Sequence, residues 1–124
     1  MIHLDTSFLI RALQPGSPQE RRLLEWLRKG EPVGLSAIAW AEFLCGPVDD
    51  AVLGLARTLL GVPAPLDDRV AERAAVLFNA SGRRRGTFVD CLVAATAIAE
   101  DAYLATENPR DFRPFVAGGL HLAD

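Results

Sequence analysis

The sequence has few residues of the kinds that cross-link small proteins or bind transition metals. It contains two cysteines, Cys45 and Cys91, each in an apolar stretch and neither with a second cysteine or a histidine at metal-ligand spacing. We interpret both as core thiols, which argues against a zinc site. The two histidines, His3 and His121, lie near opposite ends of the chain. We interpret them as packed or surface side chains and assign no mechanism to them.

Long apolar runs are absent as well. No stretch approaches the roughly 18 consecutive apolar residues that a membrane span needs, although 50% of the residues are hydrophobic. Met1 leads directly into an apolar segment, without a basic region or a small-residue cleavage site that would mark the chain for export. We therefore expect a soluble, cytoplasmic protein with no membrane partner. We expect its 124 residues to form a single domain, residues 1–124, with a sizeable core.

Lysine is almost missing, and the net charge is negative. The formal charge is −3, and twelve of the thirteen basic residues are arginine. Nucleic-acid binding depends on neutralised phosphates, so an acidic chain at first argues against such a partner. However, if four of the acids belong to one site, the rest of the chain carries +1, and arginine is suited to bidentate phosphate contacts. The charge therefore neither supports nor excludes a nucleic-acid partner.

Short apolar segments alternate with longer amphipathic ones. The predicted strands cover residues 1–4, 32–36, 62–66, 102–105 and 116–122, the last interrupted by two glycines. The predicted helices cover residues 8–13, 18–29, 37–45, 49–60, 67–79, 87–99 and, as a short turn, 109–112. Ser17, Pro18 and Glu20 form the clearest helix start, a capping box with proline at the first position. This alternation indicates an α/β fold with a mostly parallel sheet of four to five strands and helices on both faces.

Two of the predicted helices are apolar apart from one carboxylate each. The helix over residues 37–45 is apolar on every side except at Glu42, and the helix over 87–99 has Asp90 as its only charged side chain. A helix that is apolar all round is expected to be buried. A buried carboxylate needs a proton, a cation or several hydrogen-bond donors. Both acids are therefore candidates for a functional site.

Four acids are expected at the same edge of the sheet. Asp5 follows the first strand, Glu42 lies in the second helical turn after the second, Asp90 begins the long apolar helix, and Asp111 follows the fourth strand. In a parallel sheet the functional crevice lies beyond the carboxyl ends of the strands. Each acid also has a purely structural explanation. Asp5 could be an N-cap, Asp90 could form a capping box with Thr87, Asp111 could favour a helix dipole and Glu42 could reach solvent.

The combination of the four acids favours a metal site. Several carboxylates in one apolar crevice cannot all stay ionised without compensation, because burial and like charges both favour protonation. A hard divalent cation removes this conflict, and oxygen ligands without histidine or thiolate select Mg²⁺ or Mn²⁺. Such an ion activates water and stabilises the leaving oxygen in phosphodiester hydrolysis. It also explains how a site without a histidine base could obtain its nucleophile.

The same residues resemble a known family. Four segments are similar to the motifs of a PIN domain of the VapC toxin type: Leu4-Asp5-Thr6-Ser7, Ala41-Glu42-Phe43-Leu44-Cys45-Gly46, Asp90 to Ala97, and Leu104 to Phe112. They occur in order, at family-like spacing, over nearly the whole chain. The resemblance implies a three-layer α/β/α sandwich and a Mg²⁺- or Mn²⁺-dependent endoribonuclease. It also implies a homodimer and a cognate VapB-like antitoxin encoded beside the toxin.

The resemblance also implies roles for individual residues. Asp5, Glu42 and Asp90 match the main acidic ligands, Asp111 matches the more variable fourth acid, and Thr6 and Asn108 match polar supporting positions. The run Arg83, Arg84 and Arg85 either holds RNA phosphates near the acids or is a solvated loop. The amphipathic helices at Ser17 to Lys29 and Asp49 to Leu60 are the expected surfaces for the antitoxin or a second subunit.

Other functions compete with this hypothesis. A phosphatase with Asp5 as nucleophile needs a second aspartate where the chain has Ser7, and a receiver domain needs a lysine late in the chain, whereas the only lysine is Lys29. The serious alternative is a non-catalytic PIN-like module that binds nucleic acid or protein. Retention of all four acids argues against it, because such a module would gain stability by replacing them. DNA stays open as a substrate beside RNA.

Overall fold

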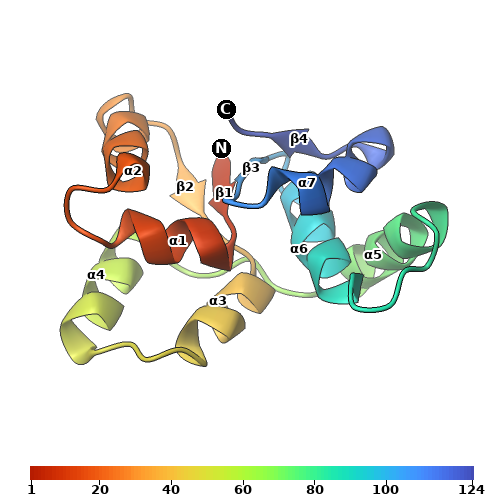
Figure 1. The fold of residues 1–124 in the computed structure, drawn as a ribbon, viewed down its shortest axis with the longest axis horizontal. Helices are drawn as coiled ribbons and strands as arrows, with labels where there is room; N and C mark the ends of the chain where they lie inside the picture. Colours follow the sequence, from red (N-terminus) through yellow and green to blue (C-terminus); the bar gives the residue numbers. More distant parts are fainter.

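A four-stranded, fully parallel sheet forms the centre of the computed structural model, which describes all residues 1–124 (Figure 1). The strands are β1 (Ile2–Leu4), β2 (Val33–Gly34), β3 (Tyr103–Ala105) and β4 (His121–Leu122), in the order β2-β1-β3-β4. All three residues of β1 are buried, as expected for a central strand covered on both faces. The register pairs the ends of β1 and β3, so the segments that follow them emerge side by side.

Helices connect the strands. Their bounds are α1 (Thr6–Ala12), α2 (Pro18–Arg28), α3 (Ala37–Leu44), α4 (Asp50–Leu60), α5 (Asp68–Ala80), α6 (Phe88–Ala99) and α7 (Pro109–Phe112), followed by a 3-10 helix (Arg113–Gly118). None of them is both long enough and apolar enough to cross a membrane. The predicted N-cap Ser17 accepts a hydrogen bond from the backbone N–H of Glu20 at 3.0 Å. The Glu20 carboxylate completes this cap through the N–H of Gly16 rather than that of Ser17.

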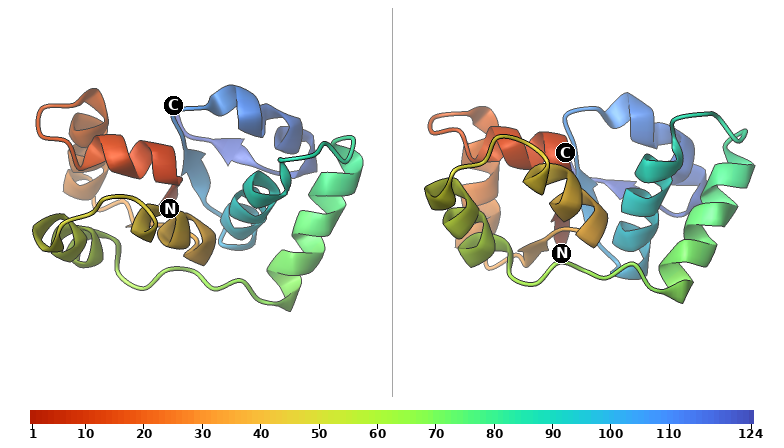
Figure 2. Two further views of the ribbon diagram at one scale, coloured as in Figure 1. Left: turned by 60° about the horizontal axis from the view of Figure 1, so that its bottom comes forward. Right: turned by 90° about the horizontal axis from the view of Figure 1, so that it is seen from below.

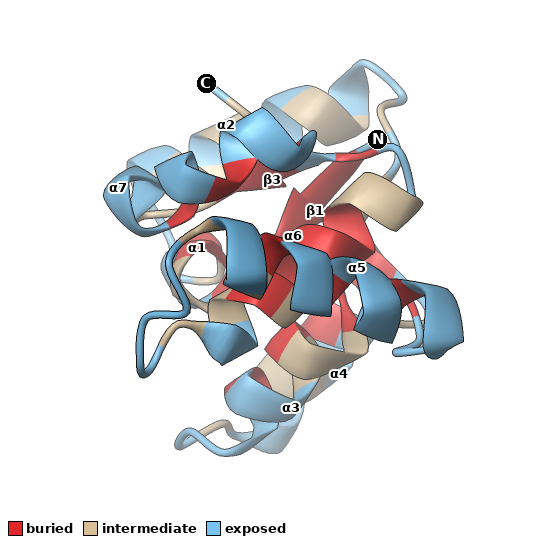
Figure 3. Ribbon diagram, turned by 90° about the vertical axis from the view of Figure 1, so that its right-hand side faces the viewer, coloured by how far each residue is buried: buried red, intermediate tan, exposed pale blue.

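Two hydrophobic cores lie on opposite faces of the sheet. Helices α1 to α4 cover one face, and α5, α6 and the C-terminal segment cover the other (Figures 1 and 2). Adjacent residues of β3 face different cores, since Leu104 belongs to one and Ala105 to the other. Helix α6 is buried between Cys91 and Ala97 except at Leu92, but Phe88 and Val89 in its first turn are exposed, so the expected burial on all sides holds only for its central part (Figure 3). The expected three-layer α/β/α architecture is therefore confirmed.

Two of the five predicted strands need correction. Residues 62–66 contribute only one isolated parallel bridge, between Ala64 and Ser36, because Pro63 and Pro65 remove two of the donors that a longer ladder needs. Residues 116–118 belong to the 3-10 helix, and only His121 and Leu122 of the last segment form a strand. The sheet therefore has four strands, the lower of the two numbers predicted.

The prediction that α3 is buried on all sides is wrong. Only Ala39 and Phe43 are buried, whereas Ala41, Leu44 and the following Cys45 are exposed. The helix packs with one face against the rest of the domain, and no other segment covers its outer face (Figure 2). Cys45 is therefore not the core thiol that the apolar sequence predicted, whereas Cys91 is.

Candidate functional site

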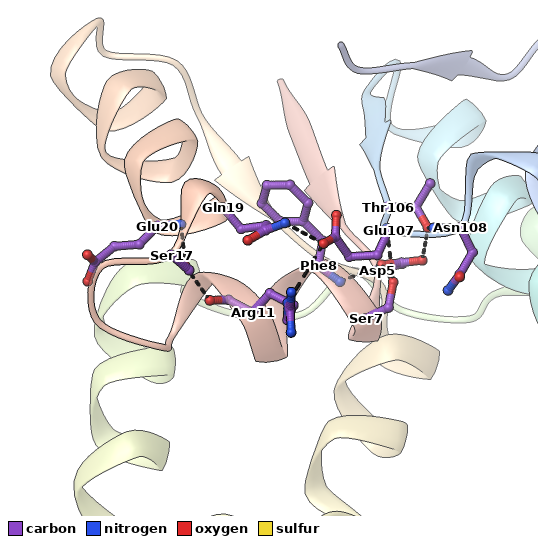
Figure 4. Close-up of polar contacts among 10 residues, drawn as sticks. All are labelled: Asp5, Ser7, Phe8, Arg11, Ser17, Gln19, Glu20, Thr106, Glu107 and Asn108. Carbon is purple, nitrogen blue, oxygen red and sulfur yellow. Dashed lines mark hydrogen bonds and ion pairs between the residues drawn. The ribbon is translucent and has the colours of Figure 1, made fainter.

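Asp5 lies at the carboxyl end of β1, beside the end of β3. Its backbone N–H donates to the carbonyl of Ala105 at 3.0 Å, which continues the pairing of the two strands by one residue. Its carboxylate receives three hydrogen bonds. Oδ1 accepts from the Ser7 hydroxyl at 2.7 Å and from the Phe8 N–H at 2.9 Å, and Oδ2 accepts from the Thr106 hydroxyl (Figure 4). Asp5 is therefore the N-cap of α1 and is fixed from two sides.

The groups that hold Asp5 are themselves held. The Ser7 hydroxyl accepts from the N–H of Glu107 at 3.1 Å, and the Thr106 hydroxyl accepts from the N–H of Asn108 at 3.0 Å. Asp5 is only 7% exposed. A carboxylate has about four lone-pair positions, of which three are occupied here. The capping role thus leaves one acceptor position on Oδ2, so capping and ligand binding are compatible.

All four candidate acids line one cavity of about 290 Å³. The cavity is bounded by Asp5, Thr6, Ser7, Ile10, Glu42, Asp90, Val93, Asn108, Asp111 and Phe112. The structure thus brings together every acidic and supporting residue that the sequence singled out. The acids surround the cavity without meeting at one point, because no three acidic, histidine or cysteine side chains form a group that could hold a metal ion.

Asp90 shows the electrostatic effect of this arrangement. Its pKa is raised from 3.8 to about 6, first by burial and then by the negative charges of Asp111, Glu42 and Asp5. Burial and the charge of Asp90 also raise the pKa of the Cys91 thiol, which makes it a poor nucleophile at neutral pH. The cavity therefore disfavours further negative charge and favours a proton or a cation.

The expected burial of Glu42 is a further error that follows from α3. Glu42 is exposed at the rim of the cavity, and its carboxylate accepts from the Thr6 hydroxyl at 3.2 Å. The same hydroxyl lies 3.2 Å from the carbonyl oxygen of Ala39. Thr6 therefore supports Glu42 rather than its neighbour Asp5. Asp111 is exposed as well, so only two of the four acids are withdrawn from solvent.

The structural explanation offered for Asp90 does not apply. Helix α6 has no side-chain cap: the backbone of Thr87 is helical, with φ −100° and ψ −4°, and its hydroxyl donates to the carbonyl of Arg84 at 2.7 Å. A capping box between Thr87 and Asp90 is thus absent. Asn108 precedes α7 but makes no side-chain capping bond either, and it lines the acidic cavity. Asp111 lies in the first turn of α7, where the helix dipole also favours a negative charge.

The three arginines of the run 83–85 have different surroundings in the structure. Arg84 and Arg85 line a second cavity of about 290 Å³, together with Arg110, which the sequence did not single out. Arg83 does not line this cavity, and its guanidinium lies 5.4 Å from the centre of the Phe78 ring. Basic side chains thus lie next to the acids, but they are not the three that the run predicted.

A family model described as "PIN domain" matches residues 2–115. The chain belongs to the PIN domain family. No curated protein matches the chain significantly.

Solved structures of the same fold cover the full length of this PIN domain. FitAcB from Neisseria gonorrhoeae is 26% identical, with a TM-score of 0.72 and coverage of 100% of this chain and 97% of the other. VapBC2 from Rickettsia felis, bound to a DNA fragment from its promoter, is 24% identical, with a TM-score of 0.76 and coverage of 99% and 98%. VapBC-1 from nontypeable Haemophilus influenzae is 21% identical, with a TM-score of 0.70 and coverage of 100% and 98%. The resemblance to VapC-type PIN domains is confirmed.

Three contributors to the site of this PIN domain were not among the predicted residues. Ser7 and Thr106 fix the carboxylate of Asp5, and both lie within segments that carry other site residues. Hydroxyl side chains directly after two neighbouring strands are the available signal. Arg110 has no such signal, because it becomes a neighbour of Arg84 only through the packing of α7 beside α6.

Proposed function

We propose that this PIN domain is a Mg²⁺- or Mn²⁺-dependent endoribonuclease that hydrolyses RNA phosphodiester bonds, as the toxin of a VapBC-type toxin–antitoxin pair. The supporting observation is that four carboxylates, from four separate segments, line one cavity at the ends of β1 and β3. PIN domains are typically nucleases, and typically bind Mg²⁺. The raised pKa of Asp90 supports the same conclusion, because a cation would relieve the repulsion that causes it.

The donor set fits a hard cation. Asp5, Glu42 and Asp90 would be the main ligands, Asp111 a fourth, and Thr6 and Asn108 would provide polar support, so every donor is an oxygen or an amide. When bound, the cation supplies charge neutralisation and an activated water for attack on phosphorus.

The acids of the cavity would have different roles in positioning the ion and accepting a proton. Asp5 is held by three donors and provides a fixed position for the ion. Glu42 and Asp111 are exposed and can therefore reorient towards the ion without unpacking the core. Neither histidine lines the cavity, which leaves the acids as its only side chains able to accept a proton from water at neutral pH.

A non-catalytic PIN-like binding module is the second candidate. It is favoured by one observation, which is that no three of the acids form a ready group for a metal ion. Binding of Mg²⁺ separates the two candidates. A nuclease site should raise the Tm of the wild type when Mg²⁺ is added, and Asp90→Asn should remove most of this shift. Equal Tm values with Mg²⁺ and with chelator would support the binding module.

The decisive experiment is cleavage of a mixed RNA pool by purified protein. Wild type should cut RNA with Mg²⁺ or Mn²⁺ and not with chelator, and Asp5→Asn and Asp90→Asn should be inactive. A control variant is Asp67→Asn, because Asp67 caps α5 through the N–H of Val70 at 2.9 Å but lies outside the cavity. Equal cleavage by the site variants and the control would refute the mechanism. Matched DNA oligonucleotides test the choice of nucleic acid.

We also propose a VapB-like antitoxin partner and a homodimer. An apolar groove of about 220 Å³ lies between α1, α3 and α4, where Leu13, Phe43 and Val52 are among the lining residues. This groove suits the apolar face of a partner helix and overlaps the predicted α4 surface. Val52→Asp should reduce co-purification with a co-expressed VapB-like antitoxin. The control is Val62→Asp, at a residue that is 93% exposed and outside the groove. Analytical ultracentrifugation tests the dimer.

A further inference from the structure

A basic cavity adjoins the acidic one. Its lining includes Arg84, Arg85 and Arg110, and it shares Asp90 and Asp111 with the acidic cavity. Two of the arginines come from the linker between α5 and α6, and the third comes from the first turn of α7 (teal and blue in Figure 2). The two acids thus form a common wall, with carboxylates gathered on one side and guanidinium groups on the other.

None of the three guanidinium groups makes an ion pair within the chain. The ion pairs of the structure involve the N-terminus, Arg11, Arg28 and Lys29, and none involves an arginine of this cavity. The carboxylates of Asp90 and Asp111 line the same cavity, so its charged side chains carry a formal excess of one positive charge. Because the three arginines are exposed and make no ion pair, their guanidinium groups are free to bind an anion that enters the cavity.

The neighbouring Arg83 makes contacts within the chain instead of lining the cavity. Its guanidinium donates to the side chain of Asn79 and packs on the ring of Phe78. The backbone of Arg83 has a positive φ of 54°, unlike that of Arg84 and Arg85. The Thr87 hydroxyl donates to the carbonyl of Arg84 at 2.7 Å, and this bond fixes the turn that carries Arg84 and Arg85. The division between packed and cavity-lining arginines is a property of the fold.

We propose that Arg84, Arg85 and Arg110 bind the phosphodiester next to the scissile one in the substrate strand. This assignment rests on the proposed nuclease function, because the acidic cavity behind the shared wall is where cleavage would occur. A guanidinium can hold two phosphate oxygens at once. The strand would then pass over Asp90 and Asp111 from one cavity into the other.

The lining favours a nucleic acid over an acidic peptide. Peptide and protein interfaces are anchored by apolar or aromatic side chains in pockets. The only large apolar side chain in this lining, Phe115, is 1% exposed and offers no such anchor. Charge and hydrogen bonding are therefore the only attractions available, which is the usual basis of contacts to a phosphate backbone.

The test is binding of a labelled single-stranded RNA in the presence of chelator, measured by fluorescence anisotropy so that cleavage plays no part. The double variant Arg84→Ala/Arg85→Ala and the single variant Arg110→Ala should each weaken Kd about tenfold or more at low salt. The slope of log K against log salt should fall by about 0.7 for each phosphate that the variant no longer neutralises. Arg83→Ala is the matched control, with a change in Kd below about twofold, and the Tm of each variant reports folding.

The outcomes separate this proposal from the proposed function. Equal weakening by Arg83→Ala and by the cavity variants overturns the site, and so does failure of folded wild type to bind RNA. Displacement of the RNA by an acidic peptide at equal charge concentration overturns the assignment to a phosphodiester. If the cavity variants lose binding but the wild type never cleaves RNA with metal, the phosphate site stands and the nuclease function falls.

Discussion

The two sides of the acidic cavity are built on different principles. On the side of β1, Asp5 is almost fully buried and receives three hydrogen bonds, from donors that are themselves held. On the side formed by α3, α6 and α7, Glu42 and Asp111 are exposed, and Asp90 is partly buried among like charges. One side is therefore preorganised by hydrogen bonds, and the other is under electrostatic repulsion. The difference indicates that Asp5 sets the position of a ligand and that the other acids adjust to it.

The largest expected effect on RNA cleavage comes from a substitution of Asp90, on the side of the cavity where the acids repel one another. Asp90→Asn should lower the rate of metal-dependent RNA cleavage at least ~100-fold, because a neutral amide is a poor ligand for a hard cation. The measurement is the initial rate of cleavage at saturating Mg²⁺. Asp67→Asn, outside the cavity, should retain the wild-type rate. Full activity of Asp90→Asn would mean that the repulsion has no catalytic purpose.

The next largest effect is a loss of stability when Asp5 is substituted, on the side that hydrogen bonds preorganise. Asp5→Ala should lower the free energy of unfolding by about 3 kcal/mol, because the α1 cap is lost and two partly buried hydroxyl donors lose their acceptor. Urea denaturation measures this loss. Asp49→Ala is the control, since Asp49 caps α4 through the N–H of Val52 at 2.8 Å but is exposed, and it should cost about 1 kcal/mol. Equal losses would show that the Asp5 network adds nothing to an ordinary cap.

A smaller effect is expected from the groups that hold Asp5. Thr106→Val removes the donor to Oδ2 and the acceptor for the Asn108 N–H while keeping the shape of the side chain. It should cost about 1 kcal/mol of stability and weaken Mg²⁺ affinity about tenfold, the usual range for a residue that orients a ligand. Thr58→Val on the exposed surface of α4 should change neither quantity measurably. Unaltered Mg²⁺ titrations of Thr106→Val would contradict the positioning role.

The same two sides differ in how well the sequence predicted them. The position of Asp5 follows from an apolar strand that ends in a carboxylate, and strand order then places Thr106 beside it. These are local patterns. The exposure of Glu42 could not be read from the apolar sequence of α3, because it depends on whether another segment covers the outer face of that helix. Burial is a property of the whole packing arrangement, and sequence periodicity reports only where an apolar face lies.

The basic cavity illustrates the same limit. The run Arg83 to Arg85 is visible in the sequence, but only the turn geometry assigns Arg83 to Phe78 and the other two to the cavity. Arg110 joins them from a helix that is distant in the chain. Likewise, Val116 to Gly118 has the composition of a strand and forms a 3-10 turn that carries Phe115 into the core. Tertiary packing decides both cases.

The finest difference between the two sides concerns protons. The pKa of Asp90 is raised to about 6, so the folded state holds this proton more tightly than the unfolded state, and its protonation stabilises the metal-free fold as pH falls through 6. Buried His3 has the opposite effect, because its pKa is lowered to about 4 and the unfolded state takes up the proton first. The pH dependence of the wild type alone therefore mixes two opposing contributions.

Comparison with Asp90→Asn removes the contribution of His3, because both proteins contain it. In chelator at pH 7.5 the variant should melt several degrees above the wild type, since the amide resembles the protonated acid and does not repel Asp5. At pH 5 the wild type carries the proton itself, so the difference should shrink towards zero. Saturating Mg²⁺ at pH 7.5 should also narrow the gap, because it stabilises the wild type more than the variant. A gap that stays constant between pH 5 and 7.5 would show that repulsion among the four acids does not shape this side of the cavity.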